Sequence, residues 1–343
     1  LGADVERHGD GVWGVVGRGV GGLSEPAGVL DLGNSGTAAR LLMGVLASHP
    51  FTSFLSGDTS LSSRPMERVM VPLRCLGADF VARSDGRLPL AVRGTSEPLP
   101  IDYAPPVPSA QVKSAILLAG LNAPGRTRVV ERLPTRDHTE RMLRHFGAEV
   151  TVEATADGGR AVTVVGQPEL TAAEITVPGD VSSAAFPIVA TLLVPGSSLA
   201  LRGVGVNPLR RGLLDTLIEM GADIAFENQR QVAGEDVADI AVRASRLGAV
   251  EVAAGRAPSM IDEYPILAVA AACTQGTTRL HGLGELRFKE SDRLLWMTDM
   301  GWIVGPFQIL LAGAMGATLI LAEGTPDYPD QGRIWRLMQD YRV

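Results

Sequence analysis

The spacing of apolar residues along the chain predicts helices that alternate with strands. In residues 66–75, 140–145 and 214–219, apolar positions recur every three or four residues, as on one face of a helix. Each segment runs into a near-copy of one tag, after which alternating apolar residues predict a half-buried strand. The glycine of the tag fits the position after a helix end, where a positive φ is common. The tags are Leu76-Gly-Ala-Asp79, Phe146-Gly-Ala-Glu149 and Met220-Gly-Ala-Asp223, with a further copy at Leu1-Gly-Ala-Asp4.

The tags begin at residues 1, 76, 146 and 220, so they are 75, 70 and 74 residues apart. This period predicts repeated α/β units of about 70 residues each. Because the first tag is at residue 1, we expect the front of its unit to be missing. The composition changes after Arg293, where three of the four tryptophans lie. The end of the chain is therefore either an aromatic-rich terminal element or a segment of different origin.

Composition excludes several classes of protein. Hydrophobic residues make up 45% of the chain and charged residues 20%, which is typical of a globular protein with a core. The net charge of −7 gives no overall attraction to nucleic acid or to anionic membranes. Two cysteines and five scattered histidines form no disulfide framework or zinc motif, and no apolar run reaches the roughly 18 residues of a membrane span. An anionic ligand would need a local cationic pocket.

The chain contains 29 arginines but only two lysines, Lys113 and Lys289. Lysine is a compact charge and arginine a planar fork, so these two positions are either chance or sites that need a particular geometry or proton chemistry. Ser109, a candidate N-cap, and Gln111 precede Lys113 at the start of an apolar helix over 115–120. The group forms either a cap with a surface lysine or a polar rim that binds hydroxyls and phosphate.

A glycine-containing turn, Asp31-Leu-Gly-Asn-Ser-Gly-Thr37, leads into another apolar helix from Leu41 onward. Free amides at such a helix start attract anions, although most turns of this kind only cap the helix. Arg64 lies directly before Pro65, which favours an extended backbone. The Arg64 side chain can then project into a cleft or into solvent.

Asp137 and Glu140 have the spacing of a capping box, which leaves Arg136 in front of the helix as a candidate anion ligand. A similar turn leads into a helix at Val177-Pro-Gly-Asp-Val-Ser-Ser183.

Acidic residues precede a further apolar helix. Asp262 and Glu263 suit the positive end of this helix, and an acid there is also a natural general base. Lys289, Glu290 and Arg293 have the spacing of one helix face. They form either an ordinary charged surface or two cations that clamp an anion beside a proton-shuttling carboxylate.

The order and spacing of these clusters are similar to those of the 5-enolpyruvylshikimate-3-phosphate synthase family, from residue 1 to about residue 293. Two of the motifs resemble its class II bacterial branch, Ser-Ala-Gln-Val-Lys-Ser-Ala (109–115) and Ser-Met-Ile-Asp-Glu-Tyr-Pro (259–265). The other matching motifs are Leu-Gly-Asn-Ser-Gly-Thr (32–37), Arg64-Pro65, Thr-Arg-Asp-His-Thr-Glu (135–140), Pro-Gly-Asp-Val-Ser-Ser (178–183) and Lys-Glu-Ser-Asp-Arg (289–293).

The resemblance implies an α/β fold of the enolpyruvyl transferase type, with two inside-out α/β barrel domains built from repeated units, here incomplete at both ends. We expect a first barrel domain over 1–178, a second over 179–294 and a foreign tail over 295–343. The tail resembles a fragment of an acetyl-CoA synthetase-like adenylating enzyme in Trp-Met-Thr-Asp-Met-Gly-Trp (296–302) and Glu-Gly-Thr-Pro-Asp-Tyr-Pro-Asp (323–330). The junction is expected near 293–296.

The resemblance also implies transfer of the enolpyruvyl group of phosphoenolpyruvate to the 5-hydroxyl of shikimate 3-phosphate, by addition and elimination in the cytoplasm. It implies a monomer that needs no metal or organic cofactor and binds neither nucleic acid nor membrane, with glyphosate as a competitor. The catalytic residues would be Asp262 and Glu290. The implied ligands of shikimate 3-phosphate are Ser109, Ala110, Gln111, Arg136, Asp262 and Lys289. The implied ligands of phosphoenolpyruvate are Gly36, Arg64, Gln111 and Arg293.

Three other readings of the sequence stay open. The family opens with a Gly-Asp-Lys-Ser segment and has a late Asp-His-Arg segment, and this chain contains neither, so it could be a catalytically dead chimeric fragment. A related transferase acts on UDP-N-acetylglucosamine, but it usually carries a loop cysteine, and Cys75 and Cys273 lie at helix ends. For a CoA ligase, too little of that family's sequence is present.

Overall fold

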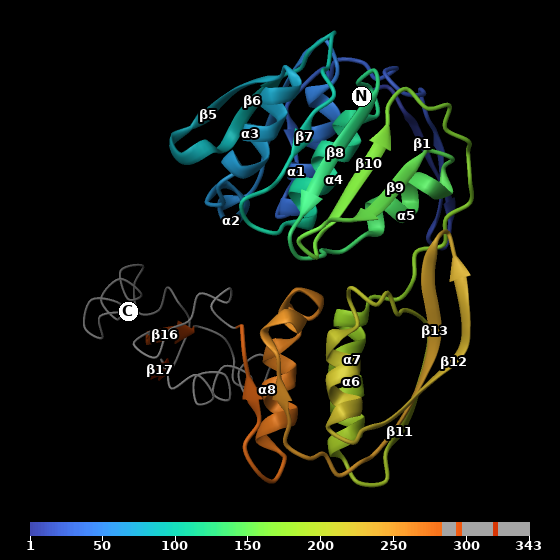
Figure 1. The fold of residues 1–343 in the computed structure, drawn as a ribbon, viewed down its shortest axis with the longest axis vertical. Helices are drawn as coiled ribbons and strands as arrows, with labels where there is room; N and C mark the ends of the chain where they lie inside the picture. Colours follow the sequence, from blue (N-terminus) through green and yellow to red (C-terminus); the bar gives the residue numbers. More distant parts are fainter. Residues whose placement is uncertain (283–292, 297–317, 322–343) are drawn as a thin grey trace. The chain divides into compact units, whose positions relative to one another are not determined.

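The computed structural model describes residues 1–282, 293–296 and 318–321 (Figure 1). Two compact units divide the chain, unit 1 over Leu1–Thr176 and unit 2 over Val177–Val343. Each unit is described by itself. Within the described residues, no helix is long and apolar enough to cross a bilayer.

Unit 1 contains two copies of one supersecondary pattern, strand–helix–strand–helix followed by a two-stranded hairpin. In each copy the first two strands pair in parallel and the hairpin pairs antiparallel, with its second strand in the middle. The first copy is β3 (Leu30–Asp31), α1 (Gly36–Ala47), β4 (Thr52–Ser56), α3 (Glu67–Leu76), β5 (Asp79–Arg83) and β6 (Arg87–Arg93), with the short helices α2 (Thr59–Ser62) and η1 (Ser84–Gly86). The second copy is β7 (Asp102–Tyr103), α4 (Ala110–Gly120), β8 (Arg126–Glu131), α5 (His138–His145), β9 (Val150–Ala154) and β10 (Arg160–Val165).

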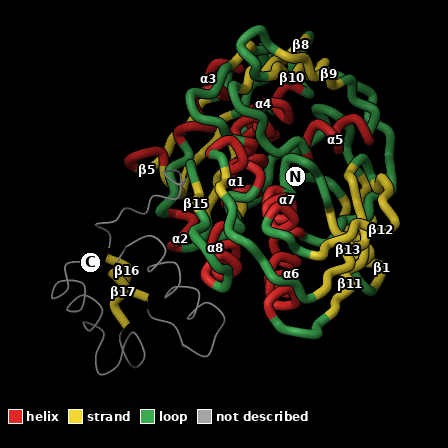
Figure 2. Tube along the Cα trace, turned by 60° about the horizontal axis from the view of Figure 1, so that its bottom comes forward, coloured by secondary structure: helices red, strands yellow, loops and turns green. Residues whose placement is uncertain are grey.

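Unit 2 repeats the pattern a third time. A parallel bridge between Gly179 and Val204 takes the place of the first strand pair, and β11, β13 and β12 form the rest of the sheet in that order. In both views β11, β12 and β13 lie to one side of α6 and α7 (Figures 1 and 2). The elements are α6 (Val181–Leu193), β11 (Ser198–Gly205), α7 (Gly212–Glu219), β12 (Asp223–Val232) and β13 (Glu235–Arg243).

The remaining elements are parts of the same pattern or short strand pairs. The first tag leads into an antiparallel hairpin, and a parallel pair, β14 and β15, flanks α8. These elements are β1 (Asp4–Gly9), β2 (Val12–Val16), β14 (Glu251–Val252), η2 (Ala254–Ser259), α8 (Tyr264–Ala272), β15 (Arg279–Leu280), β16 (Arg293–Trp296) and β17 (Thr318–Leu321).

The tags end three helices in the same way, as predicted. Gly77, Gly147 and Gly221 have φ of 116°, 89° and 93°. The amide of each glycine bonds to the carbonyl three residues earlier, and the amide of the next alanine to the carbonyl five residues earlier. These are the two hydrogen bonds of a Schellman motif, which satisfies the free carbonyls at a helix end. The predicted α/β repeat is therefore confirmed.

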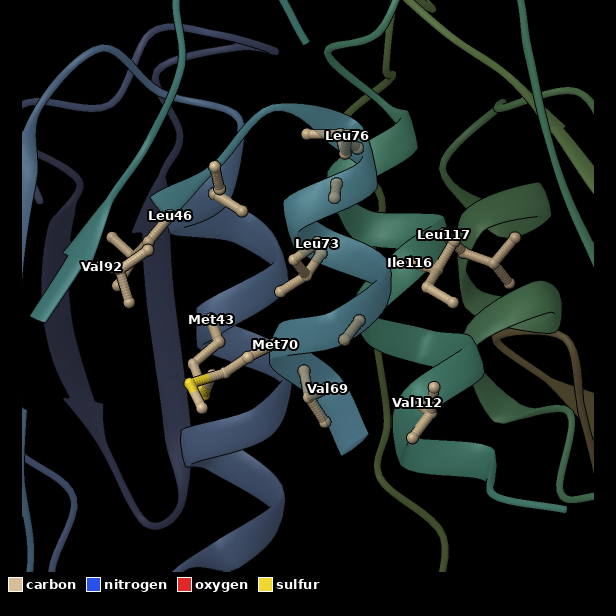
Figure 3. Close-up of a cluster of buried hydrophobic side chains, with 14 of the residues drawn as sticks. Met43, Leu46, Val69, Met70, Leu73, Leu76, Val92, Val112, Ile116 and Leu117 are labelled. Atoms are coloured by element: carbon tan, nitrogen blue, oxygen red, sulfur yellow. The ribbon is translucent and has the colours of Figure 1, made fainter. Parts of the chain in front are cut away.

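Each unit has its own hydrophobic core. In unit 1, side chains of α1, α3 and α4 meet, among them Met43, Leu73 and Ile116, all fully buried (Figure 3). A Cβ atom at Gly44 would lie 2.2 Å from the carbonyl oxygen of Ala115, so glycine is required where α1 approaches α4 at this position. The unit 2 core lies on α6, α7, α8 and β13.

One predicted element is wrong. Arg293 was expected on a helix face, but it is the first residue of β16, which pairs in parallel with β17. The apolar run Leu294-Leu-Trp296 follows Arg293 directly, and a short apolar run fits a strand as well as a helix. Lys289 and Glu290 lie outside the described residues.

Candidate functional site

Arginines gather at the N-terminus of α1, where the predicted glycine turn enters the helix. Ser35 caps the helix by accepting the amide of Ala38 at 3.1 Å. A Cβ atom at Gly36 would lie 2.8 Å from Nη1 of Arg40 and 3.2 Å from Nη1 of Arg64, so both guanidinium groups lie against this glycine. A side chain at position 36 would displace them.

The positive charge in this cluster is strong. Burial and the nearby charges of Arg68 and Arg64 lower the pKa of Arg40 to about 10. The Nε of Arg40 is buried and has no hydrogen-bond partner among the described residues. Such a cluster at a helix N-terminus suits an anion with several oxygens, because carboxylate and phosphate match the arginine fork.

Gln111 joins the start of α4 to this cluster. Its Oε1 accepts a hydrogen bond from Nη1 of Arg40 at 3.0 Å, and its Nε2 donates to Oγ1 of Thr37 at 2.9 Å. The close approach of α1 and α4 at Gly44 makes this bridge possible. These two hydrogen bonds therefore fix the orientation of the Gln111 carboxamide without a ligand.

A chain of hydrogen bonds holds Arg64. Its Nη2 donates to Oδ1 of Asn34 at 3.1 Å and to Oγ of Ser60 at 3.1 Å. Asn34 in turn donates to Oδ2 of Asp58 at 2.6 Å, and Asp58 caps α2 through the amide of Leu61. The arginine before the proline is therefore oriented by the turn and does not simply project into solvent.

The start of α5 differs from the prediction. Asp137 is the N-cap residue, but its side chain makes no capping hydrogen bond and pairs with Arg141 at 3.0 Å. Glu140 is fully buried and lies 2.7 Å from the ammonium of Lys113. The capping box is wrong because the buried lysine draws Glu140 inward. Arg136, half-buried, comes just before the helix as expected.

In unit 2, Arg210 connects two helix starts. Its guanidinium pairs with Asp262 at 3.2 Å and with Asp180, the N-cap of α6, at 3.3 Å, and it donates to Oγ of Ser182 at 2.7 Å. Glu263, which is buried, accepts a hydrogen bond from the same serine hydroxyl. The Asp262 side chain is about half exposed.

Comparison with known proteins decides the family. Residues 1–300 match the model of the family described as EPSP synthase (3-phosphoshikimate 1-carboxyvinyltransferase). The chain belongs to this family.

Curated relatives agree with the family match. The chain is 67% identical over 297 residues to the 3-phosphoshikimate 1-carboxyvinyltransferase of Paramagnetospirillum magneticum, which covers 87% of this chain and 67% of that protein. It is 64% identical over 298 residues to that of Rhodospirillum rubrum, which covers 86% of this chain and 66% of that protein. The chain thus spans about two thirds of the length of the curated relatives that it matches.

A solved structure confirms the fold. The EPSP synthase from Acinetobacter baumannii superimposes with a TM-score of 0.76 at 45% identity, over 85% of this chain and 65% of that chain. The fold is therefore the α/β fold of enolpyruvyl transferases, with mixed sheets and helices. The family match runs past the expected junction at 293–296. The resemblance of residues 295–343 to adenylating enzymes stays a prediction.

Among the residues that the EPSP synthase resemblance singled out, one set is brought together in unit 1. Gly36, Arg64 and Gln111 surround the N-terminus of α1. Ser109 and Ala110 begin α4 beside Gln111, and Ser109 is the N-cap that accepts the amide of Val112.

The other predicted residues lie elsewhere. Asp262 is in unit 2, and Arg136 precedes α5. Lys289 and Glu290 are outside the described residues, and of Arg293 only the strand position is described.

Sequence reasoning missed two residues, Arg40 and Arg210. Arg40 is a charged residue in the otherwise apolar helix α1. A charge at such a position is seldom buried unless it has a partner, so it indicates a functional or structural role. Arg210 follows Pro208 in a loop and gives no such signal, because its partners are 28 to 52 residues away. Within the described residues, no group of three or more acids, histidines or cysteines could hold a metal ion.

Proposed function

We propose that this chain transfers the enolpyruvyl group of phosphoenolpyruvate to the 5-hydroxyl of shikimate 3-phosphate, releasing phosphate. The observation that carries the proposal is the cluster of Arg40, Arg64 and Gln111 around Gly36 in a chain of the EPSP synthase family. Phosphoenolpyruvate has a carboxylate and a phosphate on one small carbon skeleton. An acidic protein needs a local cationic pocket to bind it.

The cluster in unit 1 would receive phosphoenolpyruvate. Arg64, aligned by Asn34, would bind one anionic group beside Gly36, at the N-terminus of α1. Arg40 would add charge and hold Gln111 in place. Arg293 would complete this set.

Shikimate 3-phosphate would bind to the start of α4 and to the residue before α5. Ser109, Ala110 and Gln111 present hydroxyl, amide and carboxamide groups for the sugar-like ring and its phosphate, and Arg136 adds a positive charge. Asp262 and Lys289 would complete the set.

The reaction would proceed by addition and elimination. Asp262 would take the proton of the 5-hydroxyl as its oxygen attacks C2 of phosphoenolpyruvate, and Glu290 would deliver a proton to C3. Loss of a proton from C3 and of phosphate from C2 would then restore the double bond. Arg210 holds Asp262 at 3.2 Å, which fixes the carboxylate for proton abstraction.

Finer properties belong to the same proposal. The motifs at 109–115 and 259–265 support assignment to the class II bacterial branch. We propose a cytoplasmic monomer for which glyphosate, an anion with carboxylate and phosphonate groups, competes with phosphoenolpyruvate at the arginine cluster.

Calorimetry with a phosphate-release assay tests the proposal. Wild type should bind shikimate 3-phosphate and release phosphate when phosphoenolpyruvate is added. Arg64→Ala should lose phosphoenolpyruvate binding, while Arg243→Lys, a change at an exposed residue, should not. Binding of UDP-N-acetylglucosamine instead would indicate the sister transferase. Binding of shikimate 3-phosphate without phosphate release, or of neither ligand, would support the dead-fragment alternative.

A further inference from the structure

A buried set of four charges lies behind the start of α5. Lys113 on α4 is 0% exposed, Glu140 on α5 is 0% exposed and Glu131 at the end of β8 is 3% exposed. Arg160 on β10, mostly buried, completes the set. The two positive and two negative charges balance, which makes their burial tolerable.

Three oxygens lie around the ammonium of Lys113, which donates hydrogen bonds to two of them and forms an ion pair with the third. Its Nζ lies 2.7 Å from Oε1 of Glu140, 3.1 Å from Oε2 of Glu131 and 3.4 Å from the carbonyl oxygen of Thr135. These oxygens belong to a helix, a strand and the loop between them. A compact ammonium fits among oxygens from three directions, whereas the planar arginine fork is too wide.

Three of the four charged residues form hydrogen bonds with Thr135 in that loop. The carbonyl oxygen of Thr135 accepts hydrogen bonds from both Lys113 and Arg160, and the Thr135 hydroxyl donates to Glu131. Residues 132–137 form neither helix nor strand. The next residue along the chain is Arg136.

We propose that Lys113 is a positioning residue, which acts through the buried set (Lys113, Glu131, Glu140 and Arg160) to fix Arg136 for an anionic ligand. The inference rests on the proposed function for the identity of that ligand, shikimate 3-phosphate. Lys113 does not touch the substrate. Its three contacts set the direction of the backbone after Thr135. They therefore set the position from which the Arg136 side chain extends.

The test is a double-mutant cycle between Lys113 and Arg136. Removing Lys113 alone would leave an unbalanced buried charge, so the variant is Lys113→Met with Glu140→Gln, which keeps Arg160 paired with Glu131. Shikimate 3-phosphate affinity is measured by calorimetry in wild type, in this variant, in Arg136→Ala and in the combination. Hydrogen exchange of peptides covering 131–137 is measured in the same four proteins.

Arg136→Ala should weaken binding by about 30-fold or more, as loss of a charged contact does. The change at Lys113 and Glu140 should weaken binding by about tenfold when Arg136 is present. It should weaken binding by no more than about twofold when Arg136 is already alanine. Exchange over 131–137 should accelerate. An equal loss of affinity in both backgrounds, or unchanged exchange over 131–137, overturns the proposal.

Leu73→Ala is the matched control for general loss of stability. Leu73 is fully buried on α3 in the same unit, and its truncation leaves a cavity without removing any charge. It should leave exchange over 131–137 and shikimate 3-phosphate affinity unchanged, and an effect as large as that of the Lys113 variant would overturn the proposal. If wild type fails to bind shikimate 3-phosphate, the proposed function is wrong, and the exchange data alone then decide on the positioning role.

Discussion

The surroundings of Lys113 explain why this position has lysine and not arginine. The rarity of lysine in an arginine-rich chain suggested that geometry or proton chemistry is needed there. The structure supports geometry, since Lys113 is fully buried among three oxygens of three different segments. Sequence alone could not predict this, because Glu131 and Thr135 are 18 and 22 residues away in the chain.

At Asp262 we predict a loss of catalysis without a comparable loss of binding. Asp262→Asn should lower kcat by about 10²–10⁴-fold, the usual contribution of a general base, because the amide cannot accept the hydroxyl proton. Shikimate 3-phosphate binding should change little, since asparagine keeps the size of the side chain. Steady-state kinetics with calorimetry separate the two effects.

The control for Asp262→Asn is Arg243→Lys, at a side chain that is 75% exposed. Equal losses of kcat and of shikimate 3-phosphate affinity at Asp262 would contradict its role as the base.

Asp58 should make the stability of unit 1 depend on pH. Hydrogen bonds from the Leu61 amide and from Asn34 lower the pKa of Asp58 below its ordinary value of 3.8. The carboxylate therefore stabilises the folded state fully above pH 3.8, and this contribution is lost as the pH falls through the folded-state pKa.

Asp58→Asn should be less stable than wild type at about pH 6, and the difference should shrink at about pH 3. Urea unfolding at both pH values measures it. A difference of the same size at both would contradict the role of the charge.

At the scale of elements, the helix-ending tags were the most predictable feature. A positive φ after a helix end favours glycine, and alternating apolar and polar residues favour a strand. Both signals lie within a few residues of each other in the sequence. The start of α5 was not predictable in this way. Glu140 makes its contact with Lys113 on another helix, and only the packing of α4 against α5 reveals it.

Replacing a tag glycine should cost stability through the backbone alone. At Gly147, φ is +89° and a Cβ atom would have its nearest neighbour at 3.7 Å, so Gly147→Ala adds strain without a clash. We expect a loss of about 1–2 kcal/mol in the free energy of unfolding. Urea denaturation measures this loss.

Gly28→Ala is the matched control. A Cβ atom at Gly28 would meet nothing within 4 Å, and φ there is not positive. It should be neutral or slightly stabilising. An equal loss at both positions would mean that the tag glycines matter for a reason other than φ.

At the scale of the whole molecule, the fold was predictable from the repeat and the site was predictable only in part. The residues of the glycine turn and of the start of α4 carried their own local signals. Arg210 gave no local signal and Arg40 gave only that of a charge in an apolar helix, because their partners, such as Asp262 and Gln111, are brought close by folding. The division into units also depends on which apolar residues share a core.

The segment between the two units should be the first site of proteolysis. Residues 169–177 form no helix or strand and are exposed, with Val177 at 83% exposure, while the core of each unit lies wholly within that unit. Among the described residues, brief thermolysin treatment should cut first before Leu170, Ile175 or Val177. Mass spectrometry of the fragments locates the cut, and earlier cleavage inside α1 or α6 would contradict separate, stable cores.

The arginines around Gly36 and the buried set around Lys113 differ in their response to ionic strength. The charges of Arg64 and Arg68 repel that of the buried Arg40, so dissolved salt relieves that repulsion and at the same time weakens the attraction for an anionic substrate. The buried charges are neutral in total and shielded from ions. Buffer composition should therefore change the apparent KM for phosphoenolpyruvate more than it changes the melting temperature, and assays in dilute, chloride-poor buffers should reveal the highest apparent affinity.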